Sequence, residues 1–244
     1  MTEQDLSARI AGEIRDAIVS GALIVDARLP SEAELAEQFG VSRPTVREAL
    51  KRLAAQNLIR TRRGATGGAF VRRLSFEEAQ DQQVTTATLL LSMNAVDFDT
   101  ACEARFALER ACTALAAARR TPGHLARMDR ELARQGDPAL SDEAFCASDV
   151  AFHRALVDSA ANPVLSYQLA GAIEAIEPLM NMIIFTARDR ARILDLHGAI
   201  AAALARRDAA AMDGALSTLE RYTCELAATV MARRGAAPSA ARGR

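Results

Sequence analysis

Three residues in the second half of the chain carry side chains that commonly ligate a divalent metal ion. Asp149 precedes His153 by four residues, so in a helix the carboxylate and the imidazole project from one face. Two such groups on one turn can share a divalent cation. The same spacing also suits a hydrogen bond between the two side chains, and spacing alone does not exclude it. His197, farther along, is by itself an ordinary helix histidine.

An arginine within an apolar helical segment is the second candidate. Arg105 lies in the run CEARFALE, where most neighbours are hydrophobic. A guanidinium that faces a helical interior needs an anionic partner, because an unpaired buried charge is costly. That partner is either an external anion or Glu109, which follows at i+4, and a solvated position is the remaining alternative.

Near the N-terminus, capping signals predict two short helices joined by a tight turn. Ser31 and Glu34 have capping-box spacing, and Gly40 ends the helix that they start. Ser42 is the N-cap candidate of the next helix. That helix carries basic residues at i, i+4 and i+8, namely Arg43, Arg47 and Lys51. The pattern indicates a helix-turn-helix whose second helix suits a DNA major groove.

A basic hairpin is predicted directly after this pair of helices. Residues 58–63 and 69–72 can form two strands, and Gly64, Gly67 and Gly68 lie between them. Residues 40–75 contain nine lysines or arginines and one acidic residue, a net charge of +8. A solvated basic face on a structural helix would explain the charge alone. The capped helix, tight turn, basic helix and glycine-tipped hairpin together favour a DNA-binding module.

Composition limits the class of protein. The 244 residues suffice for one large or two ordinary domains, and the low aromatic content of 4% favours helices. Residues 1–75 have 12 basic and 9 acidic groups, whereas the remainder has 18 and 22, so the basic excess is confined to the predicted DNA-binding module. The four cysteines form no C-x-x-C pair and are expected to be buried free thiols. With no targeting signal and no apolar run of spanning length, we expect a cytoplasmic protein without membrane contact.

The rest of the chain reads as an all-helical bundle. No strand alternation is found after residue 75, and turn signals separate about seven helices. Their expected ranges are 75–94, 97–119, 122–134, 140–160, 163–185, 189–206 and 208–232. The expected domains are 1–74 for DNA binding and 75–232 for the bundle, followed by a disordered tail at 233–244.

The segment LPSEAELAEQFGVSRPTVREALKRLAAQNLI resembles the winged-helix domain of the GntR family of bacterial transcription regulators. The resemblance covers about the first 75 residues. It implies that five residues lie at or near DNA, the first three in the recognition helix and the last two in the wing. These are Arg43, Thr45, Arg47, Arg63 and Gly64. Ala33 departs from the pattern, since some relatives carry a phosphate-contacting arginine there.

The second half resembles the FadR-like branch of that family, whose C-terminal effector-binding bundle is called FCD. This resemblance implies a divalent metal such as zinc, ligated by one aspartate and three histidines. Asp149, His153 and His197 match three of these positions, but Leu219 stands where the fourth ligand is expected. Arg105 matches an arginine that faces the effector pocket in the family.

These resemblances imply a homodimeric transcription regulator, and we expect a repressor. Its winged helix would bind a palindromic operator in double-stranded DNA, and its bundle would bind a small organic acid. We expect no enzymatic activity. Two alternatives remain open on the sequence alone: a metal-dependent hydrolase built on the helical bundle, and an architectural DNA-binding protein without an effector.

Overall fold

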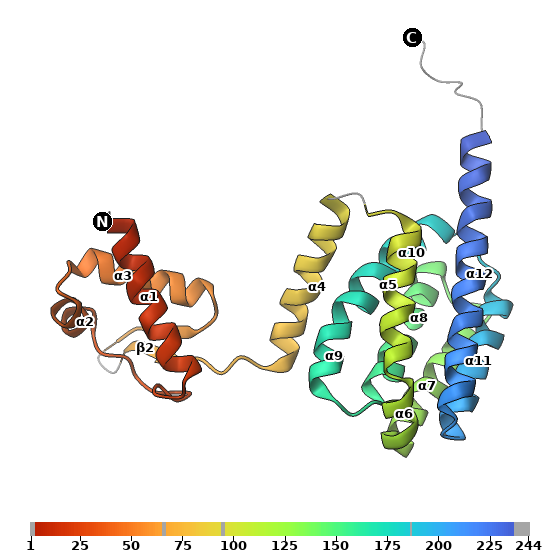
Figure 1. Ribbon diagram of the computed structural model, residues 1–244, viewed down its shortest axis with the longest axis horizontal. Helices are drawn as coiled ribbons and strands as arrows, with labels where there is room; N and C mark the ends of the chain where they lie inside the picture. The colour runs from red at the N-terminus through yellow and green to blue at the C-terminus, as the bar shows by residue number, and fades with distance from the viewer. Residues whose placement is uncertain (1–2, 65–66, 94–95, 186, 237–244) are drawn as a thin grey trace, which may run out of the picture. The chain divides into compact units, whose positions relative to one another are not determined.

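A computed structural model of the chain describes residues 3–64, 67–93, 96–185 and 187–236. The structure divides into two compact units, residues 1–75 and 76–244, which are described separately (Figure 1). No helix within the described residues combines the length and the apolar character needed to cross a membrane.

The N-terminal unit is a winged helix-turn-helix. It contains α1 (Glu3–Val19), α2 (Glu32–Phe39), α3 (Arg43–Ala55), β1 (Ile59–Arg62) and β2 (Gly68–Val71). The capping box between Ser31 and Glu34 is present at the start of α2, and Gly40 ends that helix with a left-handed backbone at φ 62°. The Ser42 hydroxyl caps α3 at the Thr45 amide. The caps visible in the sequence therefore set the turn between the two helices.

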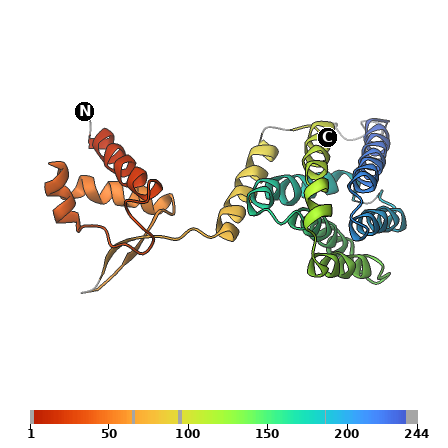
Figure 2. The ribbon, with the colours of Figure 1, turned by 60° about the horizontal axis from the view of Figure 1, so that its bottom comes forward.

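The core of this unit joins the helices to the hairpin. Ile10 of α1, Leu35 of α2 and Leu53 of α3 are buried together with Ile59 and Val71 of the strands. The antiparallel register pairs Ile59 with Val71 and Arg62 with Gly68. The hairpin projects away from the three helices of its unit (Figure 2). Its base is thus held by the core, whereas its far end faces solvent.

Glycine is required at the far end of the hairpin. A Cβ on Gly67 would lie 2.4 Å from the carbonyl oxygen of Arg62, and Gly64 has a left-handed φ of 102°. The Gly67 amide donates to the Gly64 carbonyl at 2.9 Å, which closes the turn. No larger residue fits this path without strain.

The C-terminal unit is an all-helical bundle. Its elements are α4 (Phe76–Met93), α5 (Phe98–Ala111), α6 (Thr113–Arg119), α7 (Pro122–Gln135), α8 (Asp142–Asp158), α9 (Pro163–Ala170), the π-helix η1 (Gly171–Ile176), α10 (Glu177–Ile184), α11 (Arg190–Ala205) and α12 (Ala209–Ala236). Helix α12 packs beside α11 and α5, and α4 packs on α9 and η1 (Figure 1). Phe106, Phe152, Met128, Ile173 and Leu204 are fully buried in the centre.

Two helices expected to be continuous are interrupted. The range 97–119 breaks at Cys112, because the Cys112 amide donates to Glu109 three residues back and the Thr113 hydroxyl donates to the Arg110 carbonyl. The range 163–185 contains η1, a wider turn that ends just before Pro178. Proline removes one amide and crowds the carbonyl four residues back, so a regular α-helix is disfavoured there.

The last helix extends farther than its sequence pattern indicated. Helix α12 continues to Ala236, four residues past the expected boundary at 232. The remainder of the predicted tail, residues 237–244, lies outside the described residues.

Candidate functional site

Asp149, His153 and His197 come together inside the C-terminal bundle. They are the one group of potential metal ligands that the described residues contain, and their ligand atoms all lie within 4.8 Å of one another. Asp149 and His153 come from α8, and His197 comes from α11. Both histidines are fully buried. The two side chains four residues apart on α8 and the histidine of α11 therefore lie close enough to bind one ion.

The proton of His153 is fixed by Glu109 of α5. His153 Nδ1 lies 2.6 Å from a Glu109 carboxylate oxygen, and both side chains are fully buried. Burial by itself would raise the pKa of Glu109, but the charges of His153 and Arg105 outweigh it and lower that pKa to about 2. An ionised carboxylate only accepts, so Nδ1 carries the hydrogen. In the neutral imidazole, the lone pair is therefore on Nε2.

The proton of His197 is fixed by Gln135 at the end of α7. His197 Nδ1 lies 2.8 Å from Gln135 Oε1, and Gln135 Nε2 donates to the Ser148 hydroxyl. Ser148 in turn donates to Glu131 at 2.7 Å. This series of hydrogen bonds makes Gln135 Oε1 the acceptor and His197 Nδ1 the donor. Burial lowers the pKa of His197, which favours the neutral imidazole.

When both imidazoles are neutral, as metal ligation requires, the lone pairs of the two Nε2 atoms face the same space. Neither His153 Nε2 nor His197 Nε2 has a hydrogen-bond partner among the described residues. They lie 3.9 Å and 3.2 Å from Asp149 Oδ1. Buried acceptors that face each other repel unless a cation lies between them. Ligand atoms on one zinc ion lie about 3.3 Å apart for bonds of roughly 2.0–2.1 Å. The two distances to Asp149 Oδ1 are close to this value, so the donor set fits a divalent metal once the ligands draw together.

Aromatic packing orients the imidazoles. The ring of Phe152 stacks on His197 with centroids 4.2 Å apart and planes 12° apart. His153 meets both of these rings edge-on. Each ring is thus fixed by a hydrogen bond at Nδ1 and by a neighbouring ring, the arrangement expected around metal-ligating histidines.

A small cavity adjoins the three ligands. Its volume is about 20 Å³, enough for one water molecule or for an ion, and Asp149 and His153 form part of its wall. Leu219 of α12 lies in the same wall, so the position expected for the fourth ligand faces the site but offers no donor atom. Asn181 of α10 contributes a buried amide whose Nδ2 has no partner within the described residues.

Arg105 forms the internal ion pair that was one of the alternatives left open by the sequence. It is 4% exposed and lines the cavity, and its Nε donates to Glu109 at 2.9 Å. The internal ion pair at i+4 is therefore formed. Its planar guanidinium has further donors at the terminal nitrogens, which are suited to a carboxylate.

The N-terminal unit presents a second candidate site. Arg43 and Arg47 are exposed on α3, and Arg63 and Gly64 are exposed at the end of the hairpin. Arg47 forms a two-pronged ion pair with Glu32 of α2, with its Nε at 3.1 Å and a terminal nitrogen at 2.7 Å. These four residues have the exposure that DNA contact requires.

Thr45, the remaining residue expected at or near DNA, is buried. It is 3% exposed, its amide donates to the Ser42 hydroxyl, and its own hydroxyl lies 2.8 Å from that of Ser42. Its side chain faces the core, because position 45 falls on the buried face of α3 beside Val46 and Ala49. In this structure Thr45 supports the start of the helix, and its position at or near DNA stays a prediction.

Both halves of the chain match known family models. Residues 6–71 match the model for bacterial regulatory proteins of the gntR family, and residues 100–222 match the FCD domain. The chain belongs to the GntR family. Its FCD domain is the helical bundle that contains the Asp149, His153 and His197 cluster.

Relatives of this GntR-family chain are named as regulators, not as enzymes. The putative L-lactate dehydrogenase operon regulatory protein of Escherichia coli is 33% identical over 70% of this chain. The chain covers 65% of that relative's length, just under two thirds. The galactonate operon transcriptional repressor of Escherichia coli is 32% identical over 69% of this chain and 72% of the repressor. The family and these named relatives are transcription regulators, not enzymes, which speaks against the hydrolase considered from the sequence.

A solved structure supports the fold of the whole chain. Streptococcus agalactiae GntR aligns with a TM-score of 0.58 and 21% identity, covering 91% of this chain and 99% of that one.

Sequence reasoning missed the supporting residues of the FCD site. Glu109 was considered only as a partner of Arg105, and Gln135 and Asn181 were not considered at all. Gln135 acts on a histidine 62 residues away, and no local spacing reveals such a pair.

Proposed function

We propose that this chain is a DNA-binding transcription regulator whose operator affinity is controlled by a small anionic metabolite bound in the FCD domain. The observation that carries the proposal is the pairing, in one chain, of an exposed basic helix-turn-helix face with a separate buried polar cavity. A winged helix alone would serve an architectural role. The cavity adds a place where a metabolite can be sensed.

The DNA contacts are assigned to α3 and the hairpin. Arg43 and Arg47 lie on the exposed face of α3 and suit the edges of bases or nearby phosphates in a major groove. Arg63 and Gly64 suit the adjacent minor groove, where a glycine turn allows close approach to the backbone. As a bacterial regulator that binds the chromosome, the protein would act in the cytoplasm.

The effector is proposed to be a small hydroxycarboxylate. Arg105 lines the cavity with donors suited to a carboxylate, and Tyr222 and Thr223 place hydroxyl-bearing side chains in the same wall. Two relatives are named for L-lactate dehydrogenase and galactonate operons, and lactate and galactonate are both hydroxycarboxylates. Because the cavity is small, binding would require α10 or α12 to move outward.

The donor set of Asp149, His153 and His197 supports a divalent metal at the base of this cavity. A bound ion would supply positive charge and open coordination positions, since three protein ligands leave at least one position of a zinc ion unfilled. The hydroxycarboxylate would then be held between this charge and Arg105. Asn181 would donate a hydrogen bond from the opposite side.

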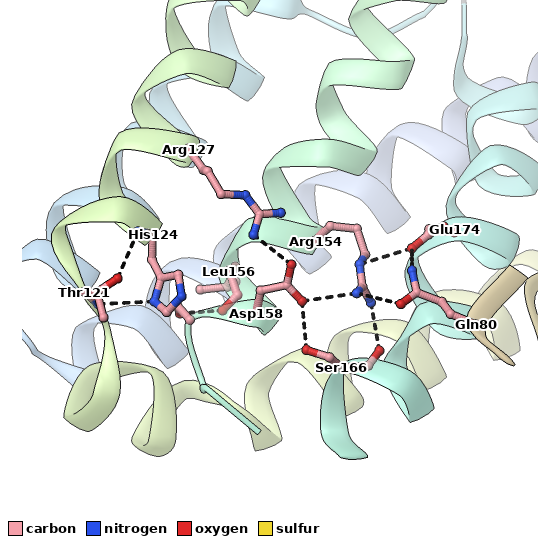
Figure 3. A network of polar contacts seen from close by, with 10 residues as sticks. Gln80, Thr121, His124, Arg127, Arg154, Leu156, Asp158, Ser166 and Glu174 are labelled. Carbon is pink, nitrogen blue, oxygen red and sulfur yellow. Dashed lines mark hydrogen bonds and ion pairs between the residues drawn. The ribbon is translucent and has the colours of Figure 1, made fainter. Parts of the chain in front are cut away.

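A polar network provides a route from this site to α4, the first helix of the bundle (Figure 3). Arg154 follows His153 on α8, and its guanidinium contacts Asp158, Glu174 of η1 and Gln80 of α4. Gln80 also donates to Glu174 at 2.8 Å. A shift of α8 at His153 would therefore be transmitted to α4 through these contacts, and α4 follows the DNA-binding unit in the chain.

We propose a homodimer that reads a palindromic operator. Leu89, Leu90 and Met93 at the end of α4 are 55%, 61% and 80% exposed. Large apolar side chains clustered on one helix end favour association with another apolar surface, and a second copy supplies the same face by two-fold symmetry. Two recognition helices would then meet two half-sites, and an effector that changes their spacing would change affinity.

The test selects DNA from a random library with the purified protein and then titrates the selected sequence with and without candidate effectors. We expect an inverted repeat, and a change in affinity with lactate, galactonate or a related acid. Binding that ignores every hydroxycarboxylate would leave the architectural role as the better description. Sequence-independent binding would contradict the regulator.

A further inference from the structure

Two cysteines from distant parts of the FCD domain meet in its interior. Cys102 Sγ of α5 and Cys224 Sγ of α12 lie 3.0 Å apart, although 122 residues separate them in the sequence. Packed carbon atoms stay roughly 3.5–4.0 Å apart, and sulfur is larger than carbon. The two sulfur atoms are therefore closer than ordinary packing places them. Both are free thiols in this structure.

The two thiols differ in their access to solvent. Cys102 is fully buried, whereas Cys224 is half-buried. Burial raises the pKa of Cys102, and the hydrogen bond to Cys224 adds to that shift. An oxidant from solution would thus meet Cys224 first, with Cys102 held against it as a second thiol.

We propose that Cys102 and Cys224 form a reversible intramolecular disulfide when the protein meets a peroxide. The Cys224 thiolate attacks one peroxide oxygen and the O–O bond breaks, which gives the sulfenic acid and hydroxide. The hydroxide takes up the proton that the thiol released and becomes water. The sulfur of Cys102 then attacks Cys224 Sγ as its proton leaves, and the S–O bond breaks. Two thiols and one hydrogen peroxide become one disulfide and two waters.

The bond would join two walls of the candidate effector cavity. Cys102 lies one helical turn before Arg105, and Cys224 follows Thr223, which lines the cavity with Tyr222. A disulfide requires the sulfurs to close to about 2.05 Å, so α5 and α12 would be drawn together and covalently linked. Oxidation would therefore restrict outward movement of α12, one of the two helices whose displacement could admit a metabolite.

The experiment counts thiols and does not depend on the regulator's operator or effector. Reduced full-length protein is treated with hydrogen peroxide, denatured and titrated with a chromogenic disulfide. Wild type should fall from four thiols to two, and dithiothreitol should restore four. Mass spectrometry of an unreduced digest should link the Cys102 peptide to the Cys224 peptide within one chain.

Three variants separate this pair from general oxidation. Cys146→Ser removes the other half-buried cysteine and should fall from three thiols to one. Cys102→Ser should accumulate Cys224 sulfenic acid, which a 1,3-diketone traps, whereas wild type should trap little. Cys224→Ser should form no intramolecular disulfide. All three keep the metal-ligand cluster intact, so metal content and circular dichroism report whether they fold.

The outcomes that overturn the proposal are specific. Wild type that keeps four thiols in excess peroxide would exclude the disulfide. A disulfide mapped to Cys112 or Cys146, or one found only between two chains, would assign the chemistry elsewhere. Direct conversion of Cys224 to the sulfinic acid without a linked peptide would show that the sulfenic acid is oxidised further before Cys102 attacks it.

Discussion

His153 and Glu109 face each other across the FCD interior, with Nδ1 of the imidazole 2.6 Å from a carboxylate oxygen. Glu109 also accepts from Arg105 on its own helix through its other oxygen. One buried carboxylate therefore connects the arginine proposed to hold the effector with a histidine proposed to hold the metal. A change at either partner alters the charge felt by the other.

Replacing Glu109 tests its role behind His153. Glu109→Gln removes the negative charge, which should weaken the Nδ1 contact and reduce the basicity of Nε2. We expect zinc affinity to fall about 10- to 100-fold in a competition titration with a chelating dye. Glu103→Gln, an exposed position on the same helix, is the matched control. Equal zinc affinity in all three proteins would remove Glu109 from the metal site.

Metal content tests the three proposed ligands. Protein purified without chelator and without a histidine tag should contain about one equivalent of a divalent metal, and His153→Ala and His197→Ala should lose it. His124→Ala changes the remaining histidine, which caps α7, and should keep the metal. Metal-free wild type that stays so after incubation with zinc would contradict the site.

Position 219 allows a ligand to be added to the metal site instead of removed. Leu219 lies in the wall of the metal cavity, on the helix where a fourth ligand is expected. Leu219→His should add an imidazole and raise metal affinity relative to wild type, as measured by the same dye competition. An unchanged or lower affinity would mean that the α12 backbone holds position 219 too far from the ion or in the wrong direction.

Arg105 is tested by a change that preserves its charge. Arg105→Lys keeps the cation but loses the planar arrangement of donors, so we expect effector affinity to fall about tenfold or more by calorimetry. Arg110→Lys lies on the same helix, where Arg110 pairs with Glu220, and serves as the control. Equal effector affinity for wild type and Arg105→Ala would place the anion elsewhere.

Arg47 tests the assignment of the recognition helix. Arg47→Ala should weaken operator binding roughly ten- to hundredfold, because a two-donor contact to a guanine is lost. Arg15→Ala removes an exposed arginine of α1 and should leave binding unchanged. If gel-shift titration finds full affinity for both Arg43→Ala and Arg47→Ala, α3 is not the helix that recognises the operator.

Arg154 tests the route to α4. Arg154→Ala removes the contacts to Gln80 and Glu174 but leaves the cavity wall in place. We expect effector affinity close to wild type and a loss of most of the effector's influence on DNA binding, a coupling of about 1–3 kcal/mol in typical regulators. Arg127→Ala breaks a contact to the same Asp158 from α7 and should retain the response. Full response in Arg154→Ala would place the coupling elsewhere.

Much of this architecture is visible in the sequence, because the signals are local. The caps at Ser31 and Ser42, the turn at Gly40 and the i, i+4 pair of Asp149 and His153 all act within a few residues. Arg105 and Glu109 form the ion pair that their spacing allows. Such contacts depend on helix geometry alone, and helix geometry follows from the local pattern.

The remainder depends on packing that no local pattern encodes. Gln135 and Glu109 orient histidines 62 and 44 residues away, so their roles appear only after the helices are assembled. The π-turn at η1 and the break at Cys112 occur in sequences that otherwise read as regular helix. The family resemblance places Thr45 at or near DNA, but it does not show that the side chain is buried at the start of α3.

Arg47 of the free protein already has an anion, the carboxylate of Glu32. In the proposed complex, phosphate or a base edge would displace Glu32 from Arg47, and the released carboxylate would take up a cation from solution. An arginine that meets DNA directly releases about one condensed counterion per phosphate. Here uptake at Glu32 offsets that release, so affinity should depend less steeply on salt than the number of arginines implies. Glu32 and the operator therefore compete for the guanidinium of Arg47.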